Sequence, residues 1–160
     1  MIRWIKILLA LFVALFCLMY ALQNLFNLQQ GHGFVALMVG MEGHVAYPDH
    51  FGPAVQSSIL VWLMLGLIIF LELLAGLSAA KGAFDLWRAR TLDADTFNAS
   101  KTWALVGCGL AVLIWFGIFS AIGGAYFQMW QTEAGRGPLT DAAWFSLQNG
   151  LAFLIIHARD

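Results

Sequence analysis

Charged side chains are scarce in this sequence. Lys, Arg, Asp and Glu make up only 11% of the 160 residues, whereas they form about a quarter of an ordinary globular domain. Hydrophobic residues account for 61%, and the mean hydropathy is +0.80. These values exclude a soluble single domain. A chain of this length has room for about four membrane spans of roughly 20 residues and one substantial loop.

Dense basic clusters and a cysteine framework are also lacking. The net charge is −1 and no run of Lys and Arg is dense enough to bind nucleic acid, so nucleic acid is not expected as a partner. Cys17 and Cys108, the two cysteines, both fall in apolar runs. This placement indicates small buried side chains without a disulfide.

The sequence shows no catalytic constellation. An activated nucleophile needs a base within reach, and no histidine shares a level with the thiols and hydroxyls of the apolar runs, Cys17, Ser78, Cys108 and Ser120. Gly31-His32-Gly33 lacks the strand-to-helix context of a phosphate loop. His157 is the one histidine in a predicted span, so haem held between two helices is not expected. We therefore expect no enzyme and no cofactor, although a bound lipid is compatible with the composition.

Four long apolar runs are present instead, and they predict spans at residues 4–24, 57–80, 102–125 and about 140–158. The charged start imitates a signal peptide, but the run from Ile5 to Leu25 is long enough to span and no clear cleavage site follows it. The prediction is one all-α membrane domain, a four-helix transmembrane bundle over residues 1–160, with loops at 25–56 and 126–139 and a connector at 81–101.

Positive charge near the span ends predicts the orientation, because Lys and Arg are retained on the cytoplasmic side. Arg136 stands alone on one side of the predicted membrane, and seven basic residues lie on the other: Arg3, Lys6, Lys81, Arg88, Arg90, Lys101 and Arg159. We expect a bacterial inner-membrane protein with both termini in the cytoplasm and both outer loops in the periplasm. Six tryptophans near the predicted span ends agree: Trp4, Trp62, Trp87, Trp103, Trp130 and Trp144.

The first outer loop is predicted to be structured. Residues 33–41 are apolar but too short to cross a membrane, so they are expected to lie in the interface or to pack over the bundle. Imidazole and carboxylate side chains also crowd this loop, and the weak candidates for metal ligands are His32, Glu42, His44 and His50. Their spacing matches no metal motif, so no metal site is predicted.

Glu72 is the only ionisable residue between Ile59 and Ala80. A carboxylate in hydrocarbon must be neutralised, paired or hydrated, and helical spacing places no cation on its face. Any partner must come from another helix, and the polar candidates in the third and fourth spans are Ser120, Gln148 and Asn149. Two interpretations stay open: a neutral acid that is hydrogen-bonded inside the bundle, and a site for a proton, an ion or a cofactor.

Other residues are candidates for contact with lipid headgroups or a partner. The connector after residue 80 is expected to extend the second span as a helix, with Trp87 at the headgroups and its cations near anionic lipid. The full set of interfacial or partner-contacting candidates is Lys81, Trp87, Arg88, Arg90, Tyr126 and Trp130. In the third span, small residues recur four apart at Gly107 and Ala111 and at Gly117 and Ala121. This spacing favours close packing inside the bundle, with a homodimer seam as the alternative.

Four stretches carry a family resemblance: Glu72, residues 81–90 with Lys81-Gly82 and Leu86-Trp87-Arg88-Ala89-Arg90, Phe97-Asn98 with Lys101, and residues 115–131 from Trp115-Phe116 to Trp130-Gln131. Together they resemble the DUF2165 family, predicted small integral membrane proteins of bacteria. Asn24 and the stretch from Phe34 to Glu42 match more loosely. Ala125 departs from the family, which has an acidic residue there. The resemblance implies a four-helix bacterial inner-membrane protein and no catalysis.

These observations favour a non-catalytic accessory or assembly subunit of a larger bacterial inner-membrane complex, respiratory or photosynthetic, whose partners are lipids and other integral membrane subunits. Small size, little mass outside the membrane and close-packing glycines motivate this hypothesis. The alternative is a small transporter, channel component or proton-linked sensor in which Glu72 titrates. That role would require an oligomer, because the helices are too few for an internally repeated transporter. An enzyme acting on lipid or quinone is a third hypothesis and lacks a pair of base and nucleophile.

Overall fold

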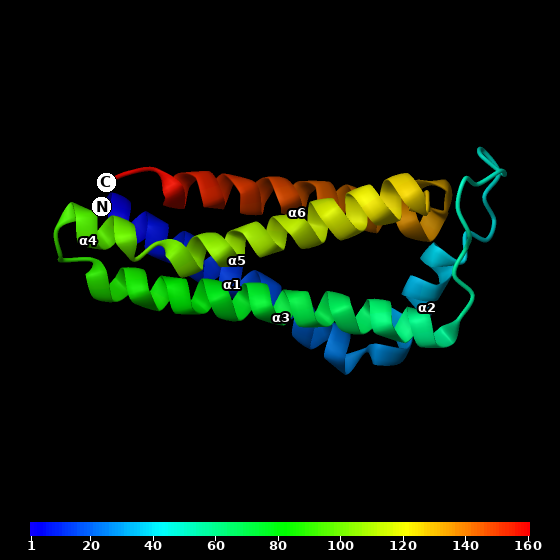
Figure 1. The fold of residues 1–160 in the computed structure, drawn as a ribbon, viewed down its shortest axis with the longest axis horizontal. Helices are drawn as coiled ribbons and strands as arrows, with labels where there is room; N and C mark the ends of the chain where they lie inside the picture. Colours follow the sequence, from blue (N-terminus) through cyan, green and yellow to red (C-terminus); the bar gives the residue numbers. More distant parts are fainter.

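The computed structural model describes residues 1–160 as a bundle of long antiparallel helices (Figure 1). Four helical stretches are long and apolar enough to cross a membrane: Ile2–Phe26, Ser58–Ala89, Ala94–Tyr126 and Glu133–His157. The predicted all-α membrane bundle is therefore confirmed. Both termini and the short helix α4 lie at one end of the bundle, here called the terminal end. Helix α2 and residues 40–57 lie at the other, here called the loop end.

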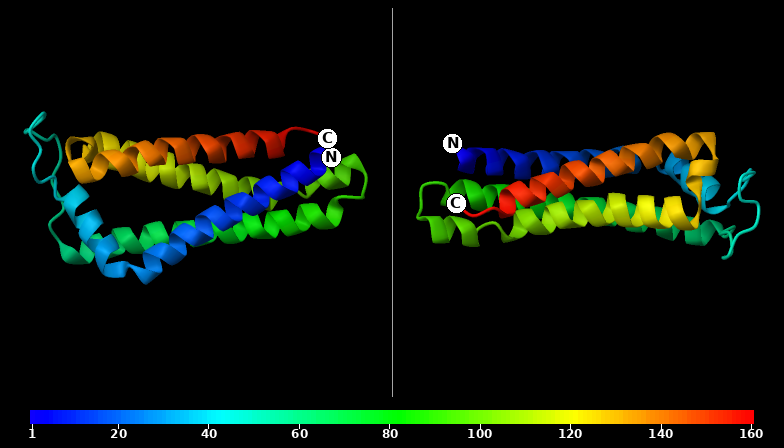
Figure 2. Two further views of the ribbon diagram at one scale, coloured as in Figure 1. Left: turned by 180° about the vertical axis from the view of Figure 1, so that it is seen from behind. Right: turned by 90° about the horizontal axis from the view of Figure 1, so that it is seen from above.

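The first span is followed by a second, short helix that does not cross the bundle. Helix α1 (Ile2–Phe26) stops at Asn27, whose backbone leaves the helical region with φ −124° and ψ 41°. Helix α2 (Leu28–Val39) then packs against α3 at the loop end (Figure 2). Its twelve residues rise only about 18 Å, too little to cross a hydrocarbon core of about 30 Å.

Helix α3 (Ser58–Ala89) extends well beyond the apolar run at residues 57–80 and includes the first part of the connector as one continuous helix. After a short turn comes α4 (Ala94–Ala99), and Asp93 is its N-cap. The Oδ1 of Asp93 accepts a hydrogen bond of 2.9 Å from the backbone N–H of Thr96. This N-cap satisfies one of the free backbone donors of the first turn. The connector therefore folds back over the terminal end.

The third span changes its helical type along its length. Helix α5 (Thr102–Val112) continues directly into η1 (Leu113–Tyr126), which is π-helical. Its C-terminal hydrogen bond runs from the N–H of Phe127 to the carbonyl of Ile122, five residues back, at 2.9 Å. Such wide turns are rare and are often found at functional sites. Here η1 forms one wall of the site described below.

The helix of the last predicted span begins before the span itself. Helix α6 (Glu133–His157) starts seven residues before the expected position 140, after the short helix η2 (Met129–Gln131). Thr132 caps it, because its Oγ1 accepts a hydrogen bond of 3.0 Å from the N–H of Gly135. Residues 133–139 of the predicted outer loop are therefore helical. The cap and the packing of α6 outweigh the helix-breaking tendency of the two glycines and Pro138 in this stretch.

Glycines allow α3 and α5 to pack closely. A Cβ atom at Gly107 would lie 2.5 Å from the backbone N of Ala79, and one at Gly82 would overlap the backbone of Ala104. The first small-residue pair, Gly107 and Ala111, thus packs inside the bundle. A Cβ at Gly117 would meet nothing within 4 Å, and Ala121 is exposed, so the second pair faces outward.

Two sets of polar contacts close the ends of the bundle. At the loop end, the Oε1 of Gln131 accepts hydrogen bonds from the N–H groups of Ala46 and Tyr47, at 2.8 and 3.0 Å. At the terminal end, Lys6 and Lys101 are 1% and 3% exposed, and both ammonium groups donate to the carbonyl of Ala158, at 2.5 and 2.7 Å. These contacts hold the last residues of the chain against α1 and α5.

Arg3 at the start of α1 forms an ion pair with Asp160 in the same terminal cluster. The Arg3 guanidinium also donates to the carbonyls of Arg90 and Leu92, at 3.0 and 2.6 Å. Its hydrogen bond to Asp160 holds the pKa of that carboxyl below its usual range. One arginine therefore links the first helix, the connector and the last residues of the chain.

We predict that Gly107→Val destabilises the protein in detergent by about 1–3 kcal/mol, because the larger side chain would overlap Ala79. Thermal unfolding followed by circular dichroism measures the change. Gly109→Val is the matched control on the same helix, since a Cβ at Gly109 meets nothing within 4 Å. Equal melting temperatures for the two variants would contradict the close packing of α3 and α5.

The ion pair predicts a pH-dependent difference between the wild type and Asp160→Asn. A lowered carboxyl pKa adds stability above the unfolded-state pKa of about 3.9, and this stability is lost as the pH falls through the folded-state pKa. The wild type should therefore be more stable at pH 7, by about 1 kcal/mol or less, and the two proteins should converge in acid. Melting curves from pH 7 downward test this, with the exposed Asp49→Asn as the control. A difference that grows in acid would contradict the prediction.

Candidate functional site

Glu72 lies in the middle of α3, is 1% exposed and faces the end of α1. The Nδ2 of Asn24 donates a hydrogen bond of 2.9 Å to its Oε2. Asn24 belongs to the last turn of α1, and α1 and α3 share the most extensive contact in the bundle. The prediction that the partner of Glu72 comes from the third or fourth span was wrong.

The three expected partners serve other purposes. The Oγ of Ser120 donates to the carbonyl of Trp115 at 3.2 Å, and the Nδ2 of Asn149 donates to the carbonyl of Phe145 at 2.8 Å. Both bonds stay within the residue's own helix. Gln148 points out of the bundle and is exposed. None of these side chains is hydrogen-bonded to Glu72.

The pairing of Asn24 with Glu72 left a signal in the sequence that was not used. Counted from the terminal end, Asn24 lies roughly 33 Å along α1 from Ile2, and Glu72 lies roughly 26 Å along α3 from Ala89. Two antiparallel helices therefore bring both polar residues to similar depths. Asn24 is the last residue of the predicted first span, and the span pattern alone does not indicate that its amide is hydrogen-bonded inside the bundle.

Two buried polar atoms near this level have no partner within the chain: Oε1 of Glu72 and Nε1 of Trp115. Trp115 belongs to an aromatic cluster that joins α1, η1 and α6. Its ring centroid lies 5.0 to 5.8 Å from those of four other rings, Phe16, Tyr20, Phe119 and Phe145. Buried polar atoms without partners are rare in folded proteins, and each calls for an explanation such as a water or a ligand.

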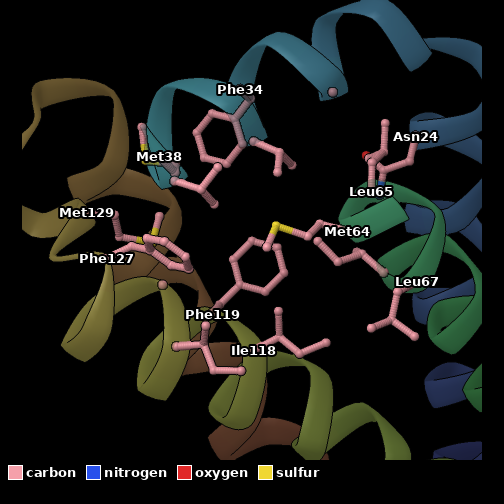
Figure 3. Close-up of a pocket in the computed structure, with 16 residues that line it drawn as sticks. Asn24, Phe34, Met38, Met64, Leu65, Leu67, Ile118, Phe119, Phe127 and Met129 are labelled. Atoms are coloured by element: carbon pink, nitrogen blue, oxygen red, sulfur yellow. The ribbon is translucent and has the colours of Figure 1, made fainter. Parts of the chain in front are cut away.

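An apolar cavity of about 270 Å³ lies between α1, α2, α3 and η1 on the loop-end side of the bundle. Sixteen residues line it and thirteen of them are hydrophobic, while Asn24 is the single polar side chain. Figure 3 shows Phe34 of α2, Met64 of α3 and Phe119 of η1 directed toward one another across this space. Asn24 therefore belongs both to the hydrogen bond with Glu72 and to the cavity wall, whereas Glu72 does not line the cavity.

The loop histidines and Glu42 form no larger cluster. The Nε2 of His32 lies 3.2 Å from the Oγ of Ser58, and its ring lies 4.4 Å from Trp62. The rings of His44 and His50 lie 5.1 Å apart, and burial, followed by the neighbouring His50, lowers the pKa of His44. Glu42 is exposed. The structure thus brings two of the four metal-ligand candidates together, and no group of three potential ligands gathers.

The basic candidates of the connector lie on the surface of the terminal end. The Nζ of Lys81 donates to the Oδ2 of Asp85 at 2.6 Å. The guanidinium of Arg90 lies 4.7 Å from the ring centroid of Trp87, and Arg88 lies 5.8 Å from that of Phe84. The two arginines thus stack on aromatic rings of their own segment.

Tyr126 and Trp130 contact this chain's own loop. The hydroxyl of Tyr126 donates to the carbonyl of Pro53 at 3.4 Å, and the ring of Trp130 lies 5.5 Å from that of Tyr47. Together with Gln131 they hold residues 46–53 over the loop end.

Comparison with known proteins places nearly the whole chain in one family. The family model described as "Predicted small integral membrane protein (DUF2165)" matches residues 2–159. No curated protein and no solved structure matches the chain.

We predict that Glu72→Ala lowers the free energy of unfolding by about 1–3 kcal/mol, because it leaves the Asn24 amide without its acceptor. Glu72→Gln retains an oxygen for Asn24 and should stay within about 1 kcal/mol of the wild type. Thermal unfolding in detergent measures the stability of both variants. Asn24→Ala and the double variant Asn24→Ala/Glu72→Ala complete a double-mutant cycle, which gives the coupling energy between the two side chains. If Glu72→Gln destabilises as much as Glu72→Ala, the hydrogen bond is not the main role of Glu72.

Proposed function

This chain belongs to the DUF2165 family of predicted small integral membrane proteins, and from that premise we propose that it is a non-catalytic accessory subunit of a larger membrane complex. It assembles with or stabilises other integral membrane subunits, in a respiratory or photosynthetic complex of a bacterial inner membrane. The observation that carries the proposal is the exposed amide of Gln148 in the middle of α6.

Gln148 lies deep within a span. It is roughly 23 Å along α6 from Glu133 and roughly 14 Å from His157, so it falls inside a hydrocarbon core of about 30 Å. Its side chain is exposed and forms no hydrogen bond within the chain. An unpaired amide in an apolar medium costs about 2–7 kcal/mol, and a polar group on a helix of another chain would remove this cost.

The surroundings of Gln148 suit a partner helix. Three exposed apolar residues share the helix face of Gln148: Trp144 lies four residues before it, and Leu151 and Ile155 lie three and seven residues after it. They form an apolar stripe with one polar group near its centre. Helix α6 is also the least covered span, because 22% of its apolar window is buried against 39% for α1 and α3. A further helix packed on this stripe would cover the most open side of the bundle.

The distribution of charge supports one orientation. The ends of α1 and α3 that carry Arg3, Lys6 and Arg88 lie together at the terminal end, while Arg136 lies near the start of α6 at the loop end. We therefore place both termini in the cytoplasm and residues 40–57 in the periplasm.

A transporter, channel component or proton-linked sensor that uses Glu72 is the second candidate. The observation in its favour is the buried Oε1 of Glu72, which has no partner within the chain. Under this hypothesis, Glu72→Gln abolishes proton flux in vesicles although the protein stays folded. Under the accessory role, flux is unaffected.

The accessory role predicts that Gln148→Leu releases the protein from its complex. After extraction from its native membrane in mild detergent, the wild type should migrate with other membrane chains on native gels and be cross-linked to them. Gln148→Leu should shift it toward the free protein, by tenfold or more in the ratio of free to bound. Mass spectrometry of the cross-linked bands identifies the partner.

Gln23→Leu is the matched control, because Gln23 is also exposed but lies one turn from the end of α1, where its amide can reach the interface. Recovery of the wild type only as a free monomer would contradict the proposal. So would a Gln148→Leu variant that keeps the full complement of partners. A cross-link to a second copy of the chain would replace the accessory role with a homodimer.

A further inference from the structure

The cavity at the loop end has the size of a small binding site. Its volume of about 270 Å³ approaches the lower limit of ligand pockets in proteins, about 300 Å³. An engineered apolar cavity of about 150 Å³ stays dry and binds benzene. The cavity of this protein therefore has room for one six-membered ring with substituents.

The wall of the cavity selects against charge and against water. Asn24 is its only polar side chain, and no Lys, Arg or His lines it. A carboxylate or phosphate would lose its hydration without gaining a cation, at a cost of several kcal/mol. Water would find too few partners, because a stable buried water makes about three hydrogen bonds. A neutral and largely apolar occupant is thus favoured over an anionic lipid headgroup.

The apolar part of the wall suits a flat ring better than a saturated chain. Three phenylalanines and three methionines line it: Phe34, Phe119, Phe127, Met38, Met64 and Met129. Aromatic rings gain from offset or edge contacts with other rings, and methionine sulfur makes favourable contacts with ring edges. These side chains come from α2, α3, η1 and the segment after η1, which surround the space on several sides (Figure 3).

The polar part of the wall can bind a carbonyl or hydroxyl group. One N–H of the Asn24 side chain is used by Glu72, which leaves its second N–H as a donor and its Oδ1 as an acceptor. The bond to Glu72 also orients the Asn24 amide, since the carboxyl is buried between the helices. The cavity thus combines an apolar interior with one oriented hydrogen-bonding group.

We propose that this cavity binds the head ring of a neutral, prenylated quinone or quinol from the bilayer, with a ring oxygen hydrogen-bonded to Asn24. Three of the helices that form the cavity, α1, α3 and η1, belong to membrane spans, so such a molecule reaches it from the lipid, and its tail remains outside the 270 Å³ volume. This inference concerns a different surface from the α6 stripe and does not depend on the accessory role. No redox step is assigned to the protein.

Binding is tested by native mass spectrometry of the full-length protein in detergent, titrated with three probes. These are a decyl-substituted benzoquinone, decylbenzene and decanoate. The quinone should bind with one-to-one saturation, and about fivefold more tightly than decylbenzene, because only the quinone offers an oxygen to Asn24. Decanoate should show no saturable binding. Equal affinity for all three probes would overturn the proposal, and so would equal affinity for the quinone and decylbenzene.

Met64→Trp tests whether the quinone binds in this cavity. Met64 lines the cavity and its side chain points into it, so a tryptophan at this position would fill the space (Figure 3). This variant should lose quinone binding at least tenfold while its melting temperature without ligand is maintained. Leu63→Trp is the matched control: Leu63 is the adjacent residue, is 64% exposed and does not line the cavity. Quinone binding by Met64→Trp at the affinity of Leu63→Trp would show that the cavity is not the site.

Discussion

The hydrogen bond from Asn24 to Glu72 gives a buried carboxyl a polar partner between α1 and α3, in a bundle whose apolar interior offers few others. It joins the two helices that share the largest contact, and the Glu72 side chain in this contact is 1% exposed. It also fixes the Asn24 amide at the edge of the apolar cavity. This one bond therefore contributes both to the contact between the first two spans and to the chemistry of the cavity.

The rest of the bundle is held at three levels by different interactions. At the terminal end, Lys6 and Lys101 bind a single carbonyl of the last residues. Next to this end, Gly82 and Gly107 bring the backbones of α3 and α5 together. At the loop end, Gln131 holds the first outer loop. The cavity lies at the level of α2, a helix too short to span the membrane. Membrane helices therefore form the floor of the cavity, and α2 forms one wall.

Prediction from sequence succeeded where one physical rule dominates. Long runs without charge identify spans because hydrocarbon tolerates little else. The expected helical extension of the second span is also found, as the last part of α3. It failed where two rules compete. The apolar run predicted the last span only from about position 140, yet the Thr132 cap starts α6 at Glu133, ahead of two glycines and Pro138. It also failed for the partner of Glu72, because choosing among polar residues on three other helices requires their rotation and depth.

The sequence alone determined that this chain is a membrane protein and how many times it can cross the bilayer. It also determined that the Glu72 carboxyl needs a polar partner, because placing a charge in hydrocarbon costs free energy. Only the tertiary structure decided that the partner is Asn24, that Gln148 faces outward and that an apolar cavity remains between α2, α3 and η1. The physical reason is that apolar composition is nearly the same on every face of these helices. Which face turns inward is therefore set by close packing and by a few hydrogen bonds between residues far apart in the chain.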